Sequence, residues 1–304
     1  MNLLYLGTPA FAVPTLERAA AAGHRVIGVF TQPDRPKGRG QRDAMPPVKE
    51  AALKLGLTVH QPERIRRPEV VEQIRAMAPE VIVVVGYGQI LPQAILDIPA
   101  HGTINVHASL LPKYRGAAPI QWAVANGEPR TGVTTMMLNA GLDTGDMLLK
   151  WETEIGAEDT AVELGERLAV AGADLLVRTL AELPGIRSEP QDHSQSTYAP
   201  ILKKEDGHID WNSPARDILN RIRGFQPWPG CYGFLRGQRL HIWKARTAEG
   251  TQAKASLVAE HRRLLVGCGS GPIEILELQM EGKKRMPAAA FLNGFTLQSD
   301  EVLA

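Results

Sequence analysis

The sequence predicts an α/β protein in which a Rossmann-like, doubly wound and mostly parallel sheet is followed by a small, OB-like β-barrel. Two observations indicate the sheet: strand-like and helix-like segments alternate along the first part of the chain, and one apolar run has the character of a strand buried on both faces. A third indicates the barrel, because the last part of the chain consists mainly of short strand-like runs separated by glycine turns.

Hydrophobic periodicity gives the elements of the predicted sheet domain. Strands are expected at 2–6, 24–31, 80–85, 103–107, 132–138 and 147–153. Helices are expected at 11–22, 48–55, 70–77, 120–125 and 161–183. Gly23 and Gly56 directly follow the first two helices, where glycine commonly ends a helix. This order predicts parallel strands joined by helical crossovers.

The texture of the sequence changes after the long helix. Prolines and polar residues without periodicity predict a linker over 185–206, which separates an N-terminal domain at 1–184 from a C-terminal domain at 207–304. In the C-terminal domain we expect a helix at 214–224 and strands at 233–235, 240–245, 255–259, 263–267 and 273–277.

Composition narrows the class of protein. The 304 residues suit roughly two domains, and no apolar run or N-terminal signal pattern indicates a membrane or secreted protein, so we expect a cytoplasmic protein and a monomer. The net charge of +1 excludes a strongly basic chain, and any nucleic-acid binding must therefore be regional. Cys231 and Cys268 are too few for a disulfide framework.

Nucleotide and metal motifs are missing from the expected positions. The first strand is followed by Gly7-Thr8-Pro9-Ala10-Phe11, which is neither a dinucleotide fingerprint nor a P-loop. No pair of histidines has helical metal-ligand spacing, and His101 and His107 are too far apart to form a local pair. We expect no metal.

An amide and an imidazole stand two residues apart where an apolar run ends. Alternation along a strand places Asn105 and His107 on one face, at the strand end where parallel sheets bind ligands. Such groups could stabilise an oxyanion. Asn and His near a strand end are also commonly structural, and that reading stays open on these two residues alone. A second segment, in which Gly141 and Gly145 bracket Asp143, could bring a carboxylate to His107.

These segments resemble the methionyl-tRNA formyltransferases, a family of the folate-dependent formyltransferase superfamily. The shared motifs are Asn105-Val106-His107, then Ser-Leu-Leu-Pro at 109–112, Tyr-Arg-Gly at 114–116, and Asp143 within Leu-Asp-Thr-Gly-Asp. The resemblance covers nearly all of the chain. It implies transfer of the formyl group of 10-formyltetrahydrofolate to the α-amino group of methionyl initiator tRNA, for translation initiation.

The resemblance also implies residue roles. Asn105 and His107 would donate hydrogen bonds to the formyl oxygen, and Asp143 would orient or charge the imidazole and help to move protons. A tetrahedral intermediate needs donors on one side and a proton acceptor on the other, which these residue types supply. Whether His107 is protonated is left open.

The two substrates would use further residues. The folate pocket is implied at Ser109, Leu110, Leu111, Pro112, Tyr87 and Ile90, with core packing as the alternative for the last two. Cationic residues of the loop 32–42 would hold tRNA, namely Arg35, Lys37, Arg39 and Arg42. From residue 207 onward thirteen Lys and Arg stand against nine Asp and Glu, a modest excess that suits a tRNA-binding domain.

Three rival functions remain. A sugar-nucleotide formyltransferase would share the motifs and chemistry, but the cationic loop suits a polyanionic acceptor better. A glycinamide ribonucleotide formyltransferase would leave the C-terminal domain unexplained. A non-catalytic RNA-binding protein on the same scaffold is a third, because fold alone does not imply activity. The joint presence of Asn105, His107 and Asp143 favours an enzyme.

Overall fold

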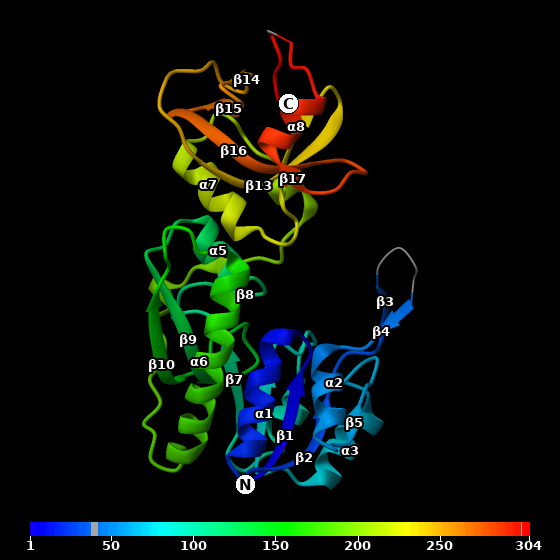
Figure 1. Ribbon diagram of the computed structural model, residues 1–304. Coiled ribbons are helices and arrows are strands. Elements are labelled where there is room, and N and C mark those ends of the chain that lie inside the picture. The colour runs from blue at the N-terminus through cyan, green and yellow to red at the C-terminus, as the bar shows by residue number, and fades with distance from the viewer. Residues whose placement is uncertain (38–41, 299) are drawn as a thin grey trace. The chain divides into compact units, whose positions relative to one another are not determined.

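The structure is a computed structural model that describes residues 1–37, 42–298 and 300–304. It contains two compact units, shown in Figure 1. The first comprises Met1–Gly116, Thr131–Thr153 and Gly165–Tyr198, and the second comprises Ala117–Arg130, Glu154–Leu164 and Ala199–Ala304. The units therefore interleave along the chain, whereas the sequence predicts contiguous domains.

The first unit is built on a seven-stranded sheet. The spatial order is β10 (Met147–Glu154), β9 (Arg130–Met137), β7 (Thr103–His107), β6 (Val81–Val85), β1 (Asn2–Gly7), β2 (Arg25–Phe30) and β5 (Val59–His60). From β7 to β5 every neighbouring pair is parallel, and β9 runs antiparallel to β7. The sheet is thus mostly parallel, as predicted, and β6 is buried at every position.

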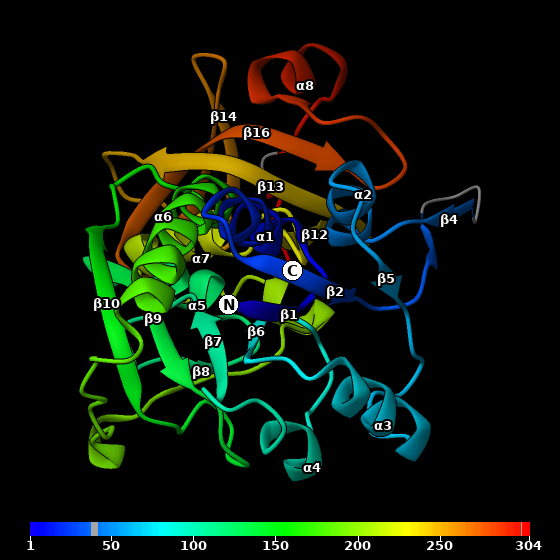
Figure 2. The same cartoon turned by 90° about the horizontal axis from the view of Figure 1, so that it is seen from below.

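Helices cover both faces of this sheet (Figure 2). Its helices are α1 (Val13–Ala21), α2 (Pro47–Lys54), α3 (Pro68–Met77), α4 (Gln93–Leu96) and α6 (Ala161–Glu182). Ile74 and Ile95, from α3 and α4, share a core with Leu4 and Leu6 of β1. On the other face, a Cβ added at Gly172 of α6 would lie 3.2 Å from Val106 of β7. The doubly wound arrangement is therefore confirmed.

Proline decides where several helices begin. The predicted helix at 11–22 starts as α-helix only at Val13, after a 3-10 turn at Ala10–Ala12, because Pro14 fits the first helical turn. Prolines stand likewise in the first turns of α2, α3 and α5 (Pro119–Ala125).

The helix α5 packs closely against α7 (Ala215–Gly224). A Cβ added at Gly224, the last residue of α7, would lie 2.6 Å from the backbone N of Ala125, the last residue of α5. This close contact places α5 in the second unit.

The second unit is an antiparallel sheet with its own core. The spatial order is β12 (Cys231–Leu235), β13 (Gln238–Thr247), β16 (Gly271–Met280), β15 (Arg263–Cys268) and β14 (Leu257–Glu260), and β17 (Met286–Pro287) pairs with β16. Two isolated bridges, Leu235 to Leu303 and Ser256 to Val302, connect both edges of the sheet to the segment 301–304. This segment closes the sheet on itself, as in the predicted small barrel.

Several elements differ from the sequence prediction. Strands β13 and β16 are longer than expected because they pair with each other along most of their length. The helix α8 (Ala288–Gly294), whose Phe291 joins the core of the second unit, was not predicted. Short elements were also not predicted, namely α4, β5, β17, β3 (Arg35–Lys37), β4 (Arg42–Ala44), β8 (Arg115–Gly116), β11 (Tyr198–Ala199) and the 3-10 turns His193–Gln195 and Lys204–Gly207. Within the described residues, no helix has the length and apolar character needed to span a bilayer.

Candidate active site

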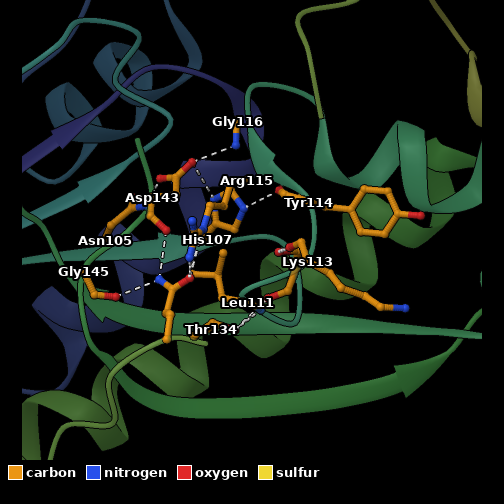
Figure 3. A network of polar contacts seen from close by, with 12 residues as sticks. Asn105, His107, Leu111, Lys113, Tyr114, Arg115, Gly116, Thr134, Asp143 and Gly145 are labelled. Atoms are coloured by element: carbon orange, nitrogen blue, oxygen red, sulfur yellow. Dashed lines mark hydrogen bonds and ion pairs between the residues drawn. The ribbon is translucent and has the colours of Figure 1, made fainter. Parts of the chain in front are cut away.

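Asn105 and His107 lie on the same face of β7, at its carboxyl end. The strand occupies Thr103–His107, as predicted, and both side chains are buried, with 8% and 6% of their surface exposed. Figure 3 shows the two side chains next to Asp143. The strand alternation therefore places a hydrogen-bond donor and an imidazole in one shielded position.

Asp143 reaches these residues from the loop between β9 and β10. The Asn105 amide donates to Asp143 Oδ1 at 3.5 Å, and His107 Nδ1 lies 3.7 Å from Asp143 Oδ2. The three side chains that were singled out separately in the sequence therefore lie together. In the antiparallel pairing of β9 with β7, Met136 lies opposite Asn105, so the loop that follows β9 and carries Asp143 starts directly beside β7.

The second ring nitrogen of His107 has a fixed partner. His107 Nε2 lies 2.9 Å from the carbonyl oxygen of Tyr114 (Figure 3). A carbonyl oxygen only accepts hydrogen bonds, so Nε2 carries a proton. A neutral ring then presents the lone pair of Nδ1 to Asp143, and a charged ring presents an N–H there. If His107 donates to a substrate, it must do so from Nδ1 with both nitrogens protonated.

Two non-glycine residues around the site have left-handed backbone conformations. Tyr114 has a φ of 59° and Asp143 a φ of 49°. This conformation costs on the order of 1 kcal/mol for an L-residue and is found preferentially at functional sites. At Tyr114 it directs the carbonyl to His107. The backbone N–H of Gly116, whose φ is 114°, donates to Asp143 Oδ2 at 2.8 Å.

The Tyr114 carbonyl and the Gly116 N–H are site groups that the sequence analysis did not identify. Both belong to the Tyr-Arg-Gly motif at 114–116, which was noted only as part of the resemblance. Their contribution comes from the backbone, so side-chain chemistry gave no signal. The glycine was the available clue, since a φ of 114° favours glycine at that position.

The predicted folate segment forms a tightly bonded turn. Ser109 is fully buried, and its hydroxyl donates to the carbonyl of Lys113 at 2.6 Å. Thr134 of β9 donates to the Ser109 carbonyl at 2.7 Å and accepts from the Leu111 N–H at 3.2 Å. Leu111 is buried and Leu110 and Pro112 are partly exposed. The Ser109 hydroxyl thus fixes the shape of this turn.

The other two residues predicted for the folate pocket have different environments. The Tyr87 side chain is 1% exposed and belongs to the core of the first unit, where burial raises the pKa of its phenol. Ile90 is 91% exposed, so core packing does not explain it. Their roles in folate binding stay predictions.

A pocket of about 530 Å³ lies at the loops that follow β1, β2 and β6. The order of the sheet reverses between β1 and β6, and such a switch point is where open α/β sheets bind ligands. The Gln32 amide donates to the Tyr87 carbonyl at 3.0 Å and so joins two of these loops. The residues that line the pocket are Thr8, Pro9, Gln32, Pro33, Arg35, Ala44, Met45, Pro46, Pro47, Gly86, Tyr87 and Gly88.

The predicted tRNA-binding loop adjoins this pocket. Arg35 is exposed and lines it, and Arg35–Lys37 pairs with Arg42–Ala44 as the two-stranded sheet of β3 and β4. Arg39 lies outside the described residues, and for Lys37 and Arg42 the structure describes the backbone. Among the residues it does describe, no group of three His, Cys, Asp or Glu side chains could hold a metal ion.

Comparison with known proteins identifies the family. Residues 1–180 match Formyl transferase, and residues 201–296 match Formyl transferase, C-terminal domain. A methionyl-tRNA formyltransferase from Solibacter usitatus (strain Ellin6076) is 62% identical over 306 residues, covering 100% of this chain and 98% of that protein. The chain belongs to the methionyl-tRNA formyltransferase family. A second relative of that name, from Koribacter versatilis (strain Ellin345), is 56% identical over 307 residues, or 100% of this chain and 98% of its own.

Solved structures with bound folates share the fold. The N-formyltransferase from Helicobacter canadensis, in complex with folinic acid and dTDP-3-aminofucose, has a TM-score of 0.67 at 17% identity, covering 92% of this chain and 99% of that one. HypX from Aquifex aeolicus, in complex with tetrahydrofolic acid, has a TM-score of 0.62 at 15% identity, covering 99% of this chain and 50% of that one. Membership of the methionyl-tRNA formyltransferase family confirms the predicted resemblance and the predicted enzyme class.

Proposed function

We propose that this protein transfers the formyl group of 10-formyltetrahydrofolate to the α-amino group of methionyl initiator tRNA. The observation that carries the proposal is the cluster of Asn105, His107 and Asp143 at the carboxyl end of β7 in a chain of this family. The names of the relatives support the acceptor, and the folate ligands of the solved structures with the same fold support a folate donor.

The geometry suggests how the three side chains share the chemistry. Attack of the amine on the formyl carbon forms a C–N bond and moves an electron pair to the formyl oxygen. The Asn105 amide and a protonated His107 Nδ1 would donate to this oxyanion. Asp143 would accept the proton that the attacking nitrogen loses, and a proton would reach the folate nitrogen as its bond to carbon breaks. Atoms and charge balance without a further reactant.

The pocket at the switch point offers space for the acceptor end. It opens on loops after β1, β2 and β6, and β6 is the direct neighbour of β7, with Val84 paired to Asn105. Arg35 and the segment 44–47 line one side, so the cationic loop leaves the pocket wall. We place the terminal nucleotide of tRNA on the Arg35 side of this pocket, next to the folate for which Tyr87 is predicted, with loop cations on the neighbouring phosphates.

The second unit would bind the body of the tRNA through one face of its sheet. On β13, Arg239, His241 and Trp243 alternate onto a common face, and Tyr232 of β12 pairs with His241. The rings of His241 and Trp243 are stacked with centroids 5.7 Å apart, and the Arg239 guanidinium lies 4.4 Å from the Tyr232 ring. We call these four residues the aromatic strip.

Two polar atoms of the aromatic strip are left to hydrogen-bond a ligand. Among the described residues, Arg239 Nε and His241 Nδ1 are buried without a hydrogen-bond partner, and both residues line a pocket of about 170 Å³. Burial, together with the charge of Arg239, lowers the pKa of His241, so the ring is neutral at pH 7. Stacking rings combined with an arginine suit single-stranded bases and phosphates of RNA.

The acceptor is tested by comparing candidate acceptors in separate assays. The purified protein is given 10-formyltetrahydrofolate with methionyl initiator tRNA, methionyl elongator tRNA or a nucleotide-linked amino sugar, and formyl transfer to each is measured. We expect the highest kcat/KM with methionyl initiator tRNA. Transfer to the amino sugar alone would support the sugar-nucleotide alternative instead.

A further inference from the structure

The buried side chain of Gln191 hydrogen-bonds the backbone of Asp143, and both its amide nitrogen and its amide oxygen have partners. It is 5% exposed, and its Nε2 donates to the carbonyl oxygens of Asp143 at 2.9 Å and Gly145 at 2.7 Å. Its Oε1 accepts from Nε and Nη2 of Arg115, at 3.0 and 2.6 Å. Both donors and both acceptor positions of the amide are therefore engaged.

These bonds connect the two segments that fix the position of the Asp143 carboxylate. One is the loop 143–145, in which Asp143 is left-handed and Gly145 has no room for a side chain, because a Cβ there would lie 1.8 Å from the Met137 carbonyl oxygen. The other is Arg115 and Gly116, whose N–H holds Asp143 Oδ2 at 2.8 Å. Figure 3 shows these groups around Asp143. A single amide thus joins the backbone of the carboxylate to the segment that hydrogen-bonds it.

The residue type matters for this function. Two carbonyl oxygens on one side require donors, and the Arg115 guanidinium on the other requires an acceptor, so the site needs an amide that presents both. A glutamate would keep the bonds to Arg115 and lose the two donors to the loop. A methionine would have a similar length and lose all four bonds. The two substitutions therefore separate the two sides of the contact.

We propose that Gln191 is a positioning residue for formyl transfer: it holds the left-handed turn at Asp143 so that the carboxylate faces Asn105 and His107. No contact of Gln191 with a substrate is required, because it acts through Asp143. The inference rests on the proposed function of Asp143 as proton acceptor.

The test is a double-mutant cycle in the full-length protein. Gln191→Met, Gln191→Glu and Asp143→Asn are prepared singly, and each Gln191 variant is also combined with Asp143→Asn. Steady-state kcat and KM are measured with 10-formyltetrahydrofolate and methionyl initiator tRNA, and the melting temperature is recorded for each. Gln195→Met is the matched control, because Gln195 is exposed and its amide bonds only the neighbouring Asp192 side chain among the described contacts.

We expect both Gln191 variants to lower kcat about 10- to 100-fold, the scale set by small misplacements of a catalytic group, with both KM values within about twofold. In the Asp143→Asn background the Gln191 substitutions should add almost nothing, because the group that they misplace is already disabled. A second readout needs no substrate: amide exchange at Gly116 should become faster in Gln191→Met, since its acceptor has moved.

Three results would overturn the proposal. These are an unchanged kcat in both Gln191 variants, an equal fractional loss with and without Asp143→Asn, or unchanged exchange at Gly116. If Gln191→Met does not fold, Gln191→Glu decides, because it retains the bonds to Arg115. Wild-type protein that fails to formylate methionyl-tRNA would instead contradict the proposed function, and the exchange measurement would still test the contact.

Discussion

At the scale of single residues, the site depends on where a few hydrogen atoms are. The Tyr114 carbonyl requires a proton on His107 Nε2, which leaves Nδ1 as the nitrogen that faces Asp143. Asp143 in turn accepts from Gly116 and Asn105, so its carboxylate is held on two sides by donors. These two donors fix the orientation of the carboxylate beside His107.

Asp143→Asn removes the proposed proton acceptor and keeps the size of the side chain. We expect kcat to fall about 10²- to 10⁴-fold, the usual contribution of a general base. The fold should persist, because asparagine accepts the left-handed conformation and its carbonyl can still accept from Gly116. Formyl-transfer kinetics and a thermal melt check both statements. Near-normal turnover would remove Asp143 from the mechanism.

At the scale of elements, pairing between strands holds the second unit together. Glu274 of β16 is 6% exposed and bonds Arg246 of β13 and Arg263 of β15, with N···O distances of 2.9 and 2.8 Å. One carboxylate thus connects three neighbouring strands. Burial alone would raise the pKa of Glu274, but hydrogen bonds from Arg263 and Arg246 outweigh it and the pKa is lowered.

Glu274→Gln should therefore destabilise the protein in a pH-dependent way. A carboxyl with a lowered native pKa contributes stability above its unfolded pKa of about 4.3, and this contribution disappears as the pH falls through the native value. We expect a loss of about 1–3 kcal/mol at pH 7 that shrinks at lower pH. Urea unfolding of the wild type and the variant, at pH values from about 3 to about 7, measures this difference in stability.

Glu277→Gln is the matched control on the same strand. Glu277 pairs with Arg285, but its side chain is 36% exposed and Arg285 is 47% exposed, so the pair is screened by water. Its loss should cost less than about 1 kcal/mol. Equal destabilisation by the two substitutions would contradict the role given to the buried carboxylate.

At the scale of the whole molecule, two separate regions are proposed for one tRNA. In this proposal the first unit would hold the reacting end beside Asp143, and the second would contact the tRNA through the aromatic strip. Phosphate contacts release counterions, so binding of tRNA should weaken steeply with salt, whereas binding of the much smaller folate should depend less on salt. The two substrates can therefore be separated by ionic strength and by substitution.

Arg239→Gln and Trp243→Ala test the strip. Each should raise the KM for methionyl-tRNA about 5- to 150-fold, since stacking or charge on RNA is worth about 1–3 kcal/mol per base, while the KM for folate and kcat at saturation stay near wild type. Arg239→Gln should also reduce the slope of log KM against log salt. Lys204→Gln, which removes one exposed charge outside the strip, is the control. Variants that match this control would exclude the strip from tRNA binding.

The sequence by itself determined the features that depend on local pattern. Apolar runs and their alternation gave the strand 103–107, the buried run of β6 and the order of strands and helices, because side-chain periodicity is a property of neighbouring residues. The same alternation placed Asn105 and His107 on one face. The motifs around them identified the family and hence the reaction.

Only the tertiary structure decided the features that join distant segments. The Tyr114 carbonyl on His107, the Gly116 N–H on Asp143 and the closure of the second sheet by residues 301–304 each depend on backbone groups brought together by folding. Backbone donors and acceptors are the same in every non-proline residue, so the sequence does not show which of them will meet. The sequence pattern was therefore enough to select the candidate site residues, whereas the way they lie together depended on the folded chain.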